Sequence, residues 1–368
     1  MRVLLLSNAD PNDFSSGGNQ RSNYIRQALL RVAQVDTIVI SQGEASSCNS
    51  GWGPERVLRI GFSSRVNAWK KAKQRLIARR VIAEAEATND YDFIVARYFG
   101  TAMLVPFGAH RKLVIDADDV RQTGSGQPFL KRVLLRIRAS VIQMVARRAA
   151  HVWLVDQRDR MILPGARCSM LPNTARAMHL PVVPSDPPRR LLMVGMYSYP
   201  PNEEGLIWFV QQILPNVESE FPDVELYAVG RFHNQLLTKL NSRLSMRGYV
   251  SDLDSEYAQA SLIICPVFSG SGTQIKVLEA VMSGRPTVAS DFSYQGFADV
   301  LRSHDHLLVA HDREEWTHHV TSVLRDPSAF SRMAQEGCRV AQDAYSVGSF
   351  HQRVIDTLHS GDLNQSSD

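Results

Sequence analysis

The segment Phe268-Ser-Gly-Ser-Gly-Thr-Gln-Ile-Lys-Val-Leu-Glu-Ala280 lies between two apolar runs, Ser261–Val267 and Gly284–Ser290. This order predicts a strand, a glycine-rich turn, a helix and a second strand. Such a turn aims free backbone N–H groups and the positive end of the helix dipole at one point, where an anion can bind. The segment therefore predicts an α/β protein with an anion pocket at this turn.

The side chains of the segment make the expected ligand more specific. Gly270 and Gly272 allow close approach of backbone to a ligand, and Thr273 is the expected N-cap. Lys276 falls in the first turn and Glu279 one turn later on the same side. A diphosphate needs the cation and N–H groups, and the two hydroxyls of a ribose suit a carboxylate, so the pattern indicates a nucleotide diphosphate. The alternative is an ordinary loop followed by a surface Lys276–Glu279 pair.

The pattern G-S-G-T-x-x-K-x-x-E-A, followed by S-G-R-P-T-V-A-S, closely resembles the nucleotide-binding segment of the retaining GT-B glycosyltransferases of family 4. In that family two glutamates eight positions apart face the donor, the first near the sugar and the second near the ribose. The resemblance implies the ribose role for Glu279, whereas Ser271 stands at the position of the first glutamate. It also implies a diphosphate site at Lys276 and the N–H groups of Gly272 and Thr273.

The resemblance extends along nearly the whole chain. Leu191–Asn202 and Val224–Arg231 are similar to the opening β-α-β of the family's C-terminal domain. The usual Arg/Lys pair after the first strand of that domain is replaced here by Met196-Tyr-Ser-Tyr-Pro, so Arg231 becomes a further candidate for the diphosphate. Gly17 and Gly18 are expected to bring an N-terminal loop close to the donor.

The 368 residues are enough for two domains with separate cores. Apolar runs of strand length alternate with longer helical stretches, which predicts parallel sheets covered on both faces. With the resemblance, this predicts a GT-B fold of two Rossmann-like doubly wound domains that face each other across a cleft. The expected parts are an acceptor-side domain at 1–180 with a helix at 346–362 packed on it, a proline-rich linker at 181–188, a nucleotide-sugar-binding domain at 189–345 and a disordered tail at 363–368.

No run of about 18 apolar residues and no signal-peptide pattern is found, so we expect a cytoplasmic protein. The four cysteines have no metal-type spacing, so no zinc site is predicted.

The net charge of +4 hides an asymmetry. Residues 1–186 carry 27 Lys and Arg against 15 Asp and Glu, and the remainder carries 14 against 22. Basic residues interleave with Trp69, Ala72 and Leu76 in the stretch 65–80, a pattern that suits the anionic inner face of a membrane. A solvated helix face explains the same pattern. We found no nucleic-acid-binding module.

Three aspartates follow an expected strand in Val114-Ile-Asp-Ala-Asp-Asp-Val120. Open α/β sheets bind ligands at this edge, so one of Asp116, Asp118 and Asp119 is expected to orient the acceptor hydroxyl. A metal site and a helix cap are alternatives. The resemblance implies that no metal or other cofactor is needed, that the donor diphosphate leaves on the face where the acceptor attacks, and that its oxygen helps to take the acceptor proton.

The function expected from these observations is a hexosyltransferase-type glycosyltransferase of polysaccharide biosynthesis, with a UDP- or GDP-sugar as donor and a saccharide or lipid-linked saccharide as acceptor. A GT-B nucleotide-sugar epimerase or hydrolase would share the nucleotide pocket without an acceptor site. A two-domain protein that binds a small ligand without chemistry is a third possibility. A dinucleotide oxidoreductase is disfavoured because neither domain opening has a G-x-G-x-x-G turn.

Overall fold

The computed structural model describes residues 1–8, 17–42, 57–62, 68–118, 120, 129–175, 189–232, 244–270 and 273–360. The chain divides into two compact units. Unit 1 comprises Met1–Asn173 and Gly348–Asp368, and unit 2 comprises Thr174–Val347. The expected linker at 181–188 and the expected tail at 363–368 lie outside the described residues.

Unit 1 contains a seven-stranded sheet in the order β3-β2-β1-β4-β5-β6-β7. All of its paired strands are parallel. The seven strands are β1 (Arg2–Ser7), β2 (Gln34–Gln42), β3 (Val57–Phe62), β4 (Phe93–Arg97), β5 (Leu113–Ala117), β6 (His151–Leu154) and β7 (Cys168–Met170). The central strands β1, β4 and β5 are apolar and buried because both faces of the sheet are covered there.

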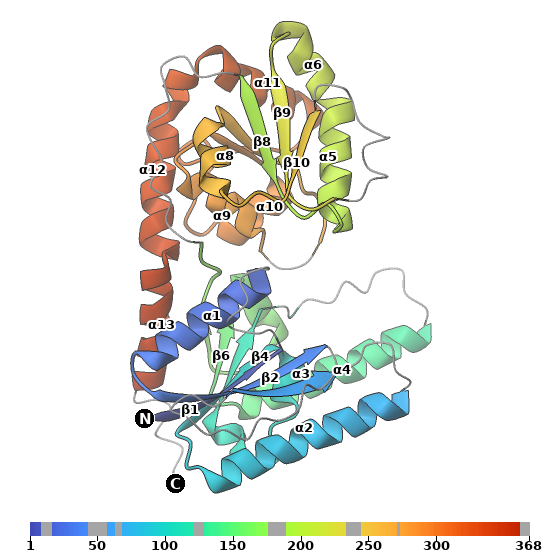
Figure 1. The fold of residues 1–368 in the computed structure, drawn as a ribbon, viewed down its shortest axis with the longest axis vertical. Helices are drawn as coiled ribbons and strands as arrows, with labels where there is room; N and C mark the ends of the chain where they lie inside the picture. The colour runs from blue at the N-terminus through green and yellow to red at the C-terminus, as the bar shows by residue number, and fades with distance from the viewer. Residues whose placement is uncertain are drawn as a thin grey trace. The chain divides into compact units, whose positions relative to one another are not determined.

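Alternate residues of these strands feed two separate cores. Leu4 and Leu6 face the core beneath α2 (Ala68–Thr88), α3 (Tyr98–Ala102) and α4 (Phe129–Arg148). Val3 and Leu5 face the core beneath α1 (Gly17–Leu30) and α13 (Val347–His359). Figure 1 shows α2 and α4 in one helical layer and α1 and α13 in the other. The short helices η1 (Phe107–Lys112) and η2 (Gln157–Ile162) complete the unit.

The C-terminal helix α13 is tied to unit 1 by specific contacts as well as by its apolar face. The indole Nε1 of Trp153 donates a hydrogen bond to Oγ1 of Thr357 at 3.0 Å. The rings of Tyr24 and Phe350 meet edge to face with centroids 6.3 Å apart. The two ends of the chain therefore build one core.

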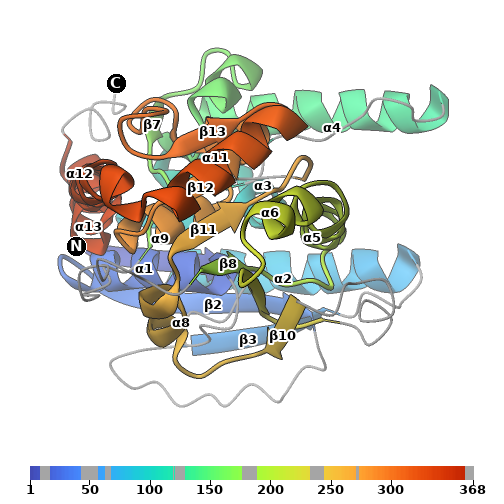
Figure 2. The same ribbon diagram turned by 90° about the horizontal axis from the view of Figure 1, so that it is seen from above.

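Unit 2 contains a six-stranded parallel sheet in the order β10-β9-β8-β11-β12-β13. Its strands are β8 (Arg190–Val194), β9 (Glu225–Val229), β10 (Leu244–Gly248), β11 (Leu262–Cys265), β12 (Thr287–Ser290) and β13 (Leu308–Ala310). The helices α5 (Pro200–Gln212), α6 (Leu214–Glu220) and α11 (Arg313–Arg325) cover one face. The helices α8 (Leu253–Gln259), α9 (Ile275–Met282) and α12 (Pro327–Tyr345) cover the other, and the short α10 (Asp291–Tyr294) and η3 (Gln295–Phe297) follow β12. Figure 2 shows α5 and α6 on the side of the strands opposite to α8 and α9.

Both sheets are doubly wound, as the sequence predicts. The strand order reverses between β1 and β4 in unit 1 and between β8 and β11 in unit 2. Open α/β sheets bind ligands outside the carboxyl ends of the strands at such a switch point. A ligand site is therefore expected at these two edges. No helix in the described part of the chain is both long enough and apolar enough to cross a membrane.

Candidate functional site

The loops that follow β8 and β11 meet closely at the switch point of unit 2. A Cβ added at Gly205 in α5 would lie 1.9 Å from the carbonyl oxygen of Pro266, which follows β11. A Cβ at Gly230 would lie 1.8 Å from the carbonyl oxygen of Gly195, which follows β8. These contacts fit only glycine, so the backbone of three strand ends is packed tightly around the edge.

Lys276 lies in the first turn of α9 and points toward α5. Its ammonium group donates a hydrogen bond to Oδ1 of Asn202, whose Nδ2 donates to the carbonyl of Met196 at 2.9 Å. Burial lowers the pKa of Lys276, and the charge of Glu279 acts in the opposite direction. An anion bound beside this ammonium would offset the cost of its burial.

Glu279 lies one helical turn after Lys276 and is partly exposed. The neighbouring Tyr257 is fully buried, and its hydroxyl has no hydrogen-bond partner among the described residues. Burial and the negative charge of Glu279 raise the pKa of Tyr257 well above its ordinary value. The carboxylate of Glu279 thus acts on both Lys276 and Tyr257.

In the glycine-rich turn, the structure requires glycine at position 270, whereas the N-cap expected at Thr273 is wrong. Gly270 has φ +125°, and an added Cβ would lie 2.8 Å from the Tyr199 hydroxyl, so glycine is required there. Thr273 is not the N-cap: α9 begins at Ile275, and its N-cap is Gln274, whose side chain makes no capping hydrogen bond. Thr273 instead packs closely on Gly296, where an added Cβ would lie 2.7 Å from Cγ2 of Thr273. Ser271 and Gly272 lie outside the described residues.

Arg231 follows β9 at the same edge of the sheet. Its carbonyl accepts a hydrogen bond from the N–H of Tyr197 at 2.7 Å, which ties it to the loop after β8. Its guanidinium lies 5.7 Å from the ring centroid of Tyr249, a side chain that is 76% exposed. An exposed aromatic ring beside a cation offers a surface on which a planar ring can stack.

A buried ionic cluster occupies the switch point of unit 1. Arg21 Nη2 and Nε contact Oδ1 and Oδ2 of Asp116 at 2.6 and 3.0 Å, and Arg97 Nη1 contacts Oδ2. Burial alone would raise the pKa of Asp116, but the two guanidinium groups hold it below its ordinary value. Both oxygens of Asp116 are engaged and its side chain is fully buried, so it is not the aspartate that reaches a ligand.

Asp118 remains partly accessible at the same edge, with 15% of its side chain exposed. Its Oδ2 lies 3.3 Å from Arg97 Nη2 and accepts a hydrogen bond from the Tyr98 hydroxyl at 3.3 Å. Tyr98 has φ 64°, a strained value for a residue with a side chain, and burial raises its pKa to about 12. Asp119 lies outside the described residues.

Gly17 and Gly18 form the start of α1. Their N–H groups belong to the first turn, which lacks intrahelical partners. The residues that precede them, 9–16, lie outside the described part of the chain. Within the described ranges, no group of three or more His, Cys, Asp or Glu residues is arranged to hold a metal ion.

Three residues of these edges were not predicted from the sequence: Asn202, Arg97 and Tyr98. Arg97 had a visible signal, because it is a charged residue at the end of the apolar run Phe93–Ala96. Asn202 and Tyr98 had none, since their roles depend on Lys276 and Asp118, which come close only in the fold.

Residues 188–326 match the family model of "Glycosyl transferases group 1". This range contains the strands, helices and glycine turn of the unit 2 edge. Two curated relatives match over less than half of the chain. A phosphatidyl-myo-inositol mannosyltransferase of Mycobacterium leprae is 28% identical over 180 residues, or 46% of this chain and 47% of that protein. An uncharacterised 44.6 kDa protein in the cps region of Klebsiella pneumoniae is 24% identical over 165 residues, or 42% of each chain. The alignments thus span about half the length of the curated relatives.

Solved structures match nearly the whole chain. The sucrose-phosphate synthase of Thermosynechococcus elongatus gives a TM-score of 0.73 at 16% identity, covering 97% of this chain and 98% of that one. The Anabaena protein HepE, solved in complex with UDP and glucose, gives 0.70 at 16% identity, covering 98% and 100%. The GT-B fold expected from the sequence, with two Rossmann-like units, is confirmed by these neighbours. The matches also support the expected relationship to the group 1 glycosyltransferases.

Proposed function

We propose that this protein is a hexosyltransferase-type glycosyltransferase. It moves a sugar, with retention and without a metal ion, from a nucleotide-diphosphate donor to a saccharide or lipid-linked saccharide. The observation that carries the proposal is the position of Lys276, held by Asn202 at the switch point of the unit that contains the matched family segment. Similarity to a protein solved with UDP and glucose supports a nucleotide-sugar donor.

The donor binds along the carboxyl edge of unit 2. Lys276 and the N–H groups of the first turn of α9 neutralise the diphosphate, and binding replaces the amide of Asn202 with a phosphate oxygen as partner of the ammonium. Glu279 accepts hydrogen bonds from the ribose hydroxyls. The exposed ring of Tyr249, beside Arg231, lies at the same edge and can stack on the base.

The reaction needs little covalent chemistry from the protein. The bond from the sugar to the donor diphosphate breaks, and the acceptor oxygen forms its bond on the same face of the sugar. A diphosphate oxygen takes the acceptor proton as it leaves. Lys276 and the helix N–H groups stabilise the negative charge that develops on the diphosphate in the transition state. Such electrostatic stabilisation lowers the activation free energy most where the site excludes water and its donors are already in position.

Asp118 is the acceptor-side residue. Its carboxylate accepts a hydrogen bond from the acceptor hydroxyl and aligns it for attack. Arg97 and Tyr98 are positioning residues: they fix one oxygen of Asp118 and leave the carboxylate partly exposed. The strained backbone of Tyr98 is consistent with a functional constraint at this point.

The exposed face of helix α2 is an argument that the acceptor is lipid-linked and lies at the cytoplasmic face of a membrane. It buries Ala78 and Ile82 against unit 1, yet Trp69, Leu76 and Ile77 are 77%, 60% and 47% exposed. At helical spacing these three lie on the side opposite to the buried pair, together with Lys73 and Arg80. A second apolar face with basic residues suits insertion at an anionic lipid surface, so we propose peripheral membrane attachment.

Measurement of nucleotide diphosphate release from UDP-, GDP- and ADP-sugars, with and without a lipid extract, tests this function. A transferase releases nucleotide only when an acceptor is present. Release without any acceptor would indicate the hydrolase, and interconversion of the sugar nucleotide would indicate the epimerase. Asp118→Asn should reduce acceptor-dependent release while donor binding is unchanged. Absence of both binding and turnover with all three donor classes would reject the proposal.

A further inference from the structure

The start of α5 contacts the glycine-rich turn and the first turn of α9 at two points. Asn202 accepts a hydrogen bond from the ammonium group of Lys276, just beyond the turn. Tyr199, the N-cap residue of α5, reaches the turn itself. A Cβ built on Gly270 would lie 2.8 Å from the hydroxyl oxygen of Tyr199 and 3.7 Å from its Cζ. The hydroxyl of Tyr199 therefore lies at the turn beside which the donor diphosphate is proposed to bind.

The loop between β8 and α5 carries two tyrosines whose hydroxyl groups differ in their surroundings. The hydroxyl of Tyr197 donates a hydrogen bond to the carbonyl of Met193 at 2.8 Å, and its side chain is fully buried. Tyr199 is only half-buried, and no hydrogen bond joins its hydroxyl to another residue in the described part of the chain. One hydroxyl thus serves the core, whereas the other is available to a ligand at the turn.

The backbone at the start of α5 offers an anion no N–H group. The N–H of Tyr199 donates to the carbonyl of Met196 at 3.1 Å, and the two prolines that open the helix have no N–H. The N–H groups of Asn202 and Glu203 donate to the carbonyl of Tyr199 at 3.0 and 3.3 Å. The loop at 196–199 also contains no Lys or Arg. An anion at this end of α5 therefore depends on side-chain hydroxyl groups.

We propose that Tyr199 is a donor-binding residue whose hydroxyl donates a hydrogen bond to a phosphate oxygen of the donor diphosphate. The inference rests on the proposed function and adds to it a contact from α5. A hydrogen bond to an anionic oxygen is shorter and stronger than one between neutral groups. The hydroxyl is itself neutral, so it avoids the desolvation cost that a second buried cation beside Lys276 would bring. Lys276 then supplies the positive charge, and Tyr199 supplies a neutral donor from the neighbouring helix.

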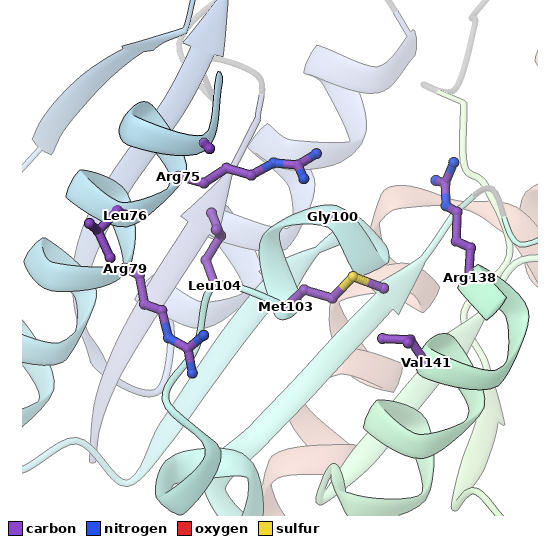
Figure 3. A pocket seen from close by; sticks show the side chains of 9 residues that line it. Arg75, Leu76, Arg79, Gly100, Met103, Leu104, Arg138 and Val141 are labelled. Carbon is purple, nitrogen blue, oxygen red and sulfur yellow. The ribbon is translucent and has the colours of Figure 1, made fainter. Parts of the chain in front are cut away.

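A cationic surface in unit 1 is the main competing site for a diphosphate. A groove of about 560 Å³ between α2 and α4 is lined by Arg75 and Arg79 together with apolar side chains. Figure 3 shows the guanidinium group of Arg79 directed away from that of Arg75, so the two do not face one phosphate. The double variant Arg75→Gln/Arg79→Gln should therefore bind diphosphate with an affinity within about twofold of the wild-type value.

The test compares two changes of one oxygen atom in the same loop. Tyr199→Phe removes the hydroxyl and keeps the ring against Gly270, and Tyr197→Phe removes the hydroxyl that serves the core. Calorimetry measures the affinity for inorganic diphosphate and for whichever of UDP, GDP and ADP binds most tightly. We expect both affinities to fall at least about tenfold in Tyr199→Phe, because a charge-assisted hydrogen bond is lost, and to stay within about twofold in Tyr197→Phe. The Tm without ligand should fall only in Tyr197→Phe, whose hydroxyl has a protein partner.

Three results would overturn the inference. Equal affinity for inorganic diphosphate in the wild type and Tyr199→Phe would show that the hydroxyl does not bind phosphate. A loss of affinity for the nucleotide alone would place the hydroxyl at the ribose or the base. A loss in Arg75→Gln/Arg79→Gln as large as that in Tyr199→Phe would show that diphosphate binds in unit 1. A wild-type protein that binds neither inorganic diphosphate nor any of the three nucleotides would instead reject the proposed function, and the inference with it.

Discussion

The ammonium group of Lys276 donates a hydrogen bond to Oδ1 of Asn202, across 74 positions of sequence. This bond joins the first turn of α9 to the first turn of α5 at the switch point of unit 2. It keeps a partly buried cation in the first turn of α9. The amide oxygen is a neutral partner, so an incoming phosphate can replace it at little cost and with a gain in charge pairing.

The Glu279→Gln substitution separates the proposed ribose contact from the proposed diphosphate contact. Charge-assisted hydrogen bonds are worth roughly 1.5–3 kcal/mol, so kcat/KM for the donor should fall at least about tenfold. Affinity for inorganic diphosphate should stay the same, because that ligand lacks a ribose. Wild-type donor kinetics in Glu279→Gln would place the ribose elsewhere.

Metal dependence is tested by comparing chelation with Lys276→Ala. If Lys276 and the helix N–H groups neutralise the diphosphate, transfer survives EDTA, and the substitution causes the larger loss. Both measurements use the same donor at saturating acceptor. Activity that disappears with EDTA and returns with Mg²⁺ or Mn²⁺ would contradict this and direct attention to Asp118 and Asp119.

Asp116→Asn should destabilise unit 1. The substitution leaves the buried guanidinium groups of Arg21 and Arg97 without their common carboxylate, and breaking a buried ion pair costs about 3–5 kcal/mol. Denaturant unfolding followed by circular dichroism measures the loss. The matched control is Asp223→Asn, which removes an exposed pair with Arg189 and should have little effect. Equal stability of the two variants would show that the buried cluster is dispensable.

Acid sensitivity should depend on His151. Burial, with the charge of Arg167, lowers the pKa of His151 from 6.5 to about 4. Between these values the unfolded chain binds the proton and the folded protein does not, so stability is fully present above pH 6.5 and falls as the pH falls toward 4. His151→Gln should flatten this part of the profile of unfolding free energy against pH. An unchanged slope from pH 6.5 to 4 would exclude this histidine as the cause.

The fold was predictable because its strands are buried on both faces. Such strands appear as short apolar runs, and runs such as Val35–Ile40 and Leu262–Val267 fall within or overlap the observed β2 and β11. The glycine at position 270 was also readable, since its positive φ and the nearby Tyr199 hydroxyl tolerate no side chain. Buried strands and glycines with positive φ depend on the residue types within one short segment, so they can be predicted from that segment.

The side-chain partners at the two edges were not predictable. Asp116 looks like a ligand-facing residue at a strand end, but Arg21, 95 residues away, and Arg97 neutralise it inside the fold. Thr273 has the right chemistry for a cap, yet packing against Gly296 accompanies a helix start at Ile275. In each case the residue that contacts the predicted one lies outside its segment, so the pattern of that segment cannot predict the contact.

The central claim, that Lys276 marks a nucleotide-diphosphate site, is tested most directly by thermal shift with UDP, GDP and ADP. A ligand at 100 times its Kd stabilises the folded protein by about 2.7 kcal/mol, so at least one nucleotide should raise the Tm of the wild-type protein by several degrees. Lys276→Ala should lose most of that shift at the same ligand concentration while its Tm without ligand stays close to the wild-type value. Equal shifts in the two proteins, or no shift with any of the three nucleotides, would contradict the claim.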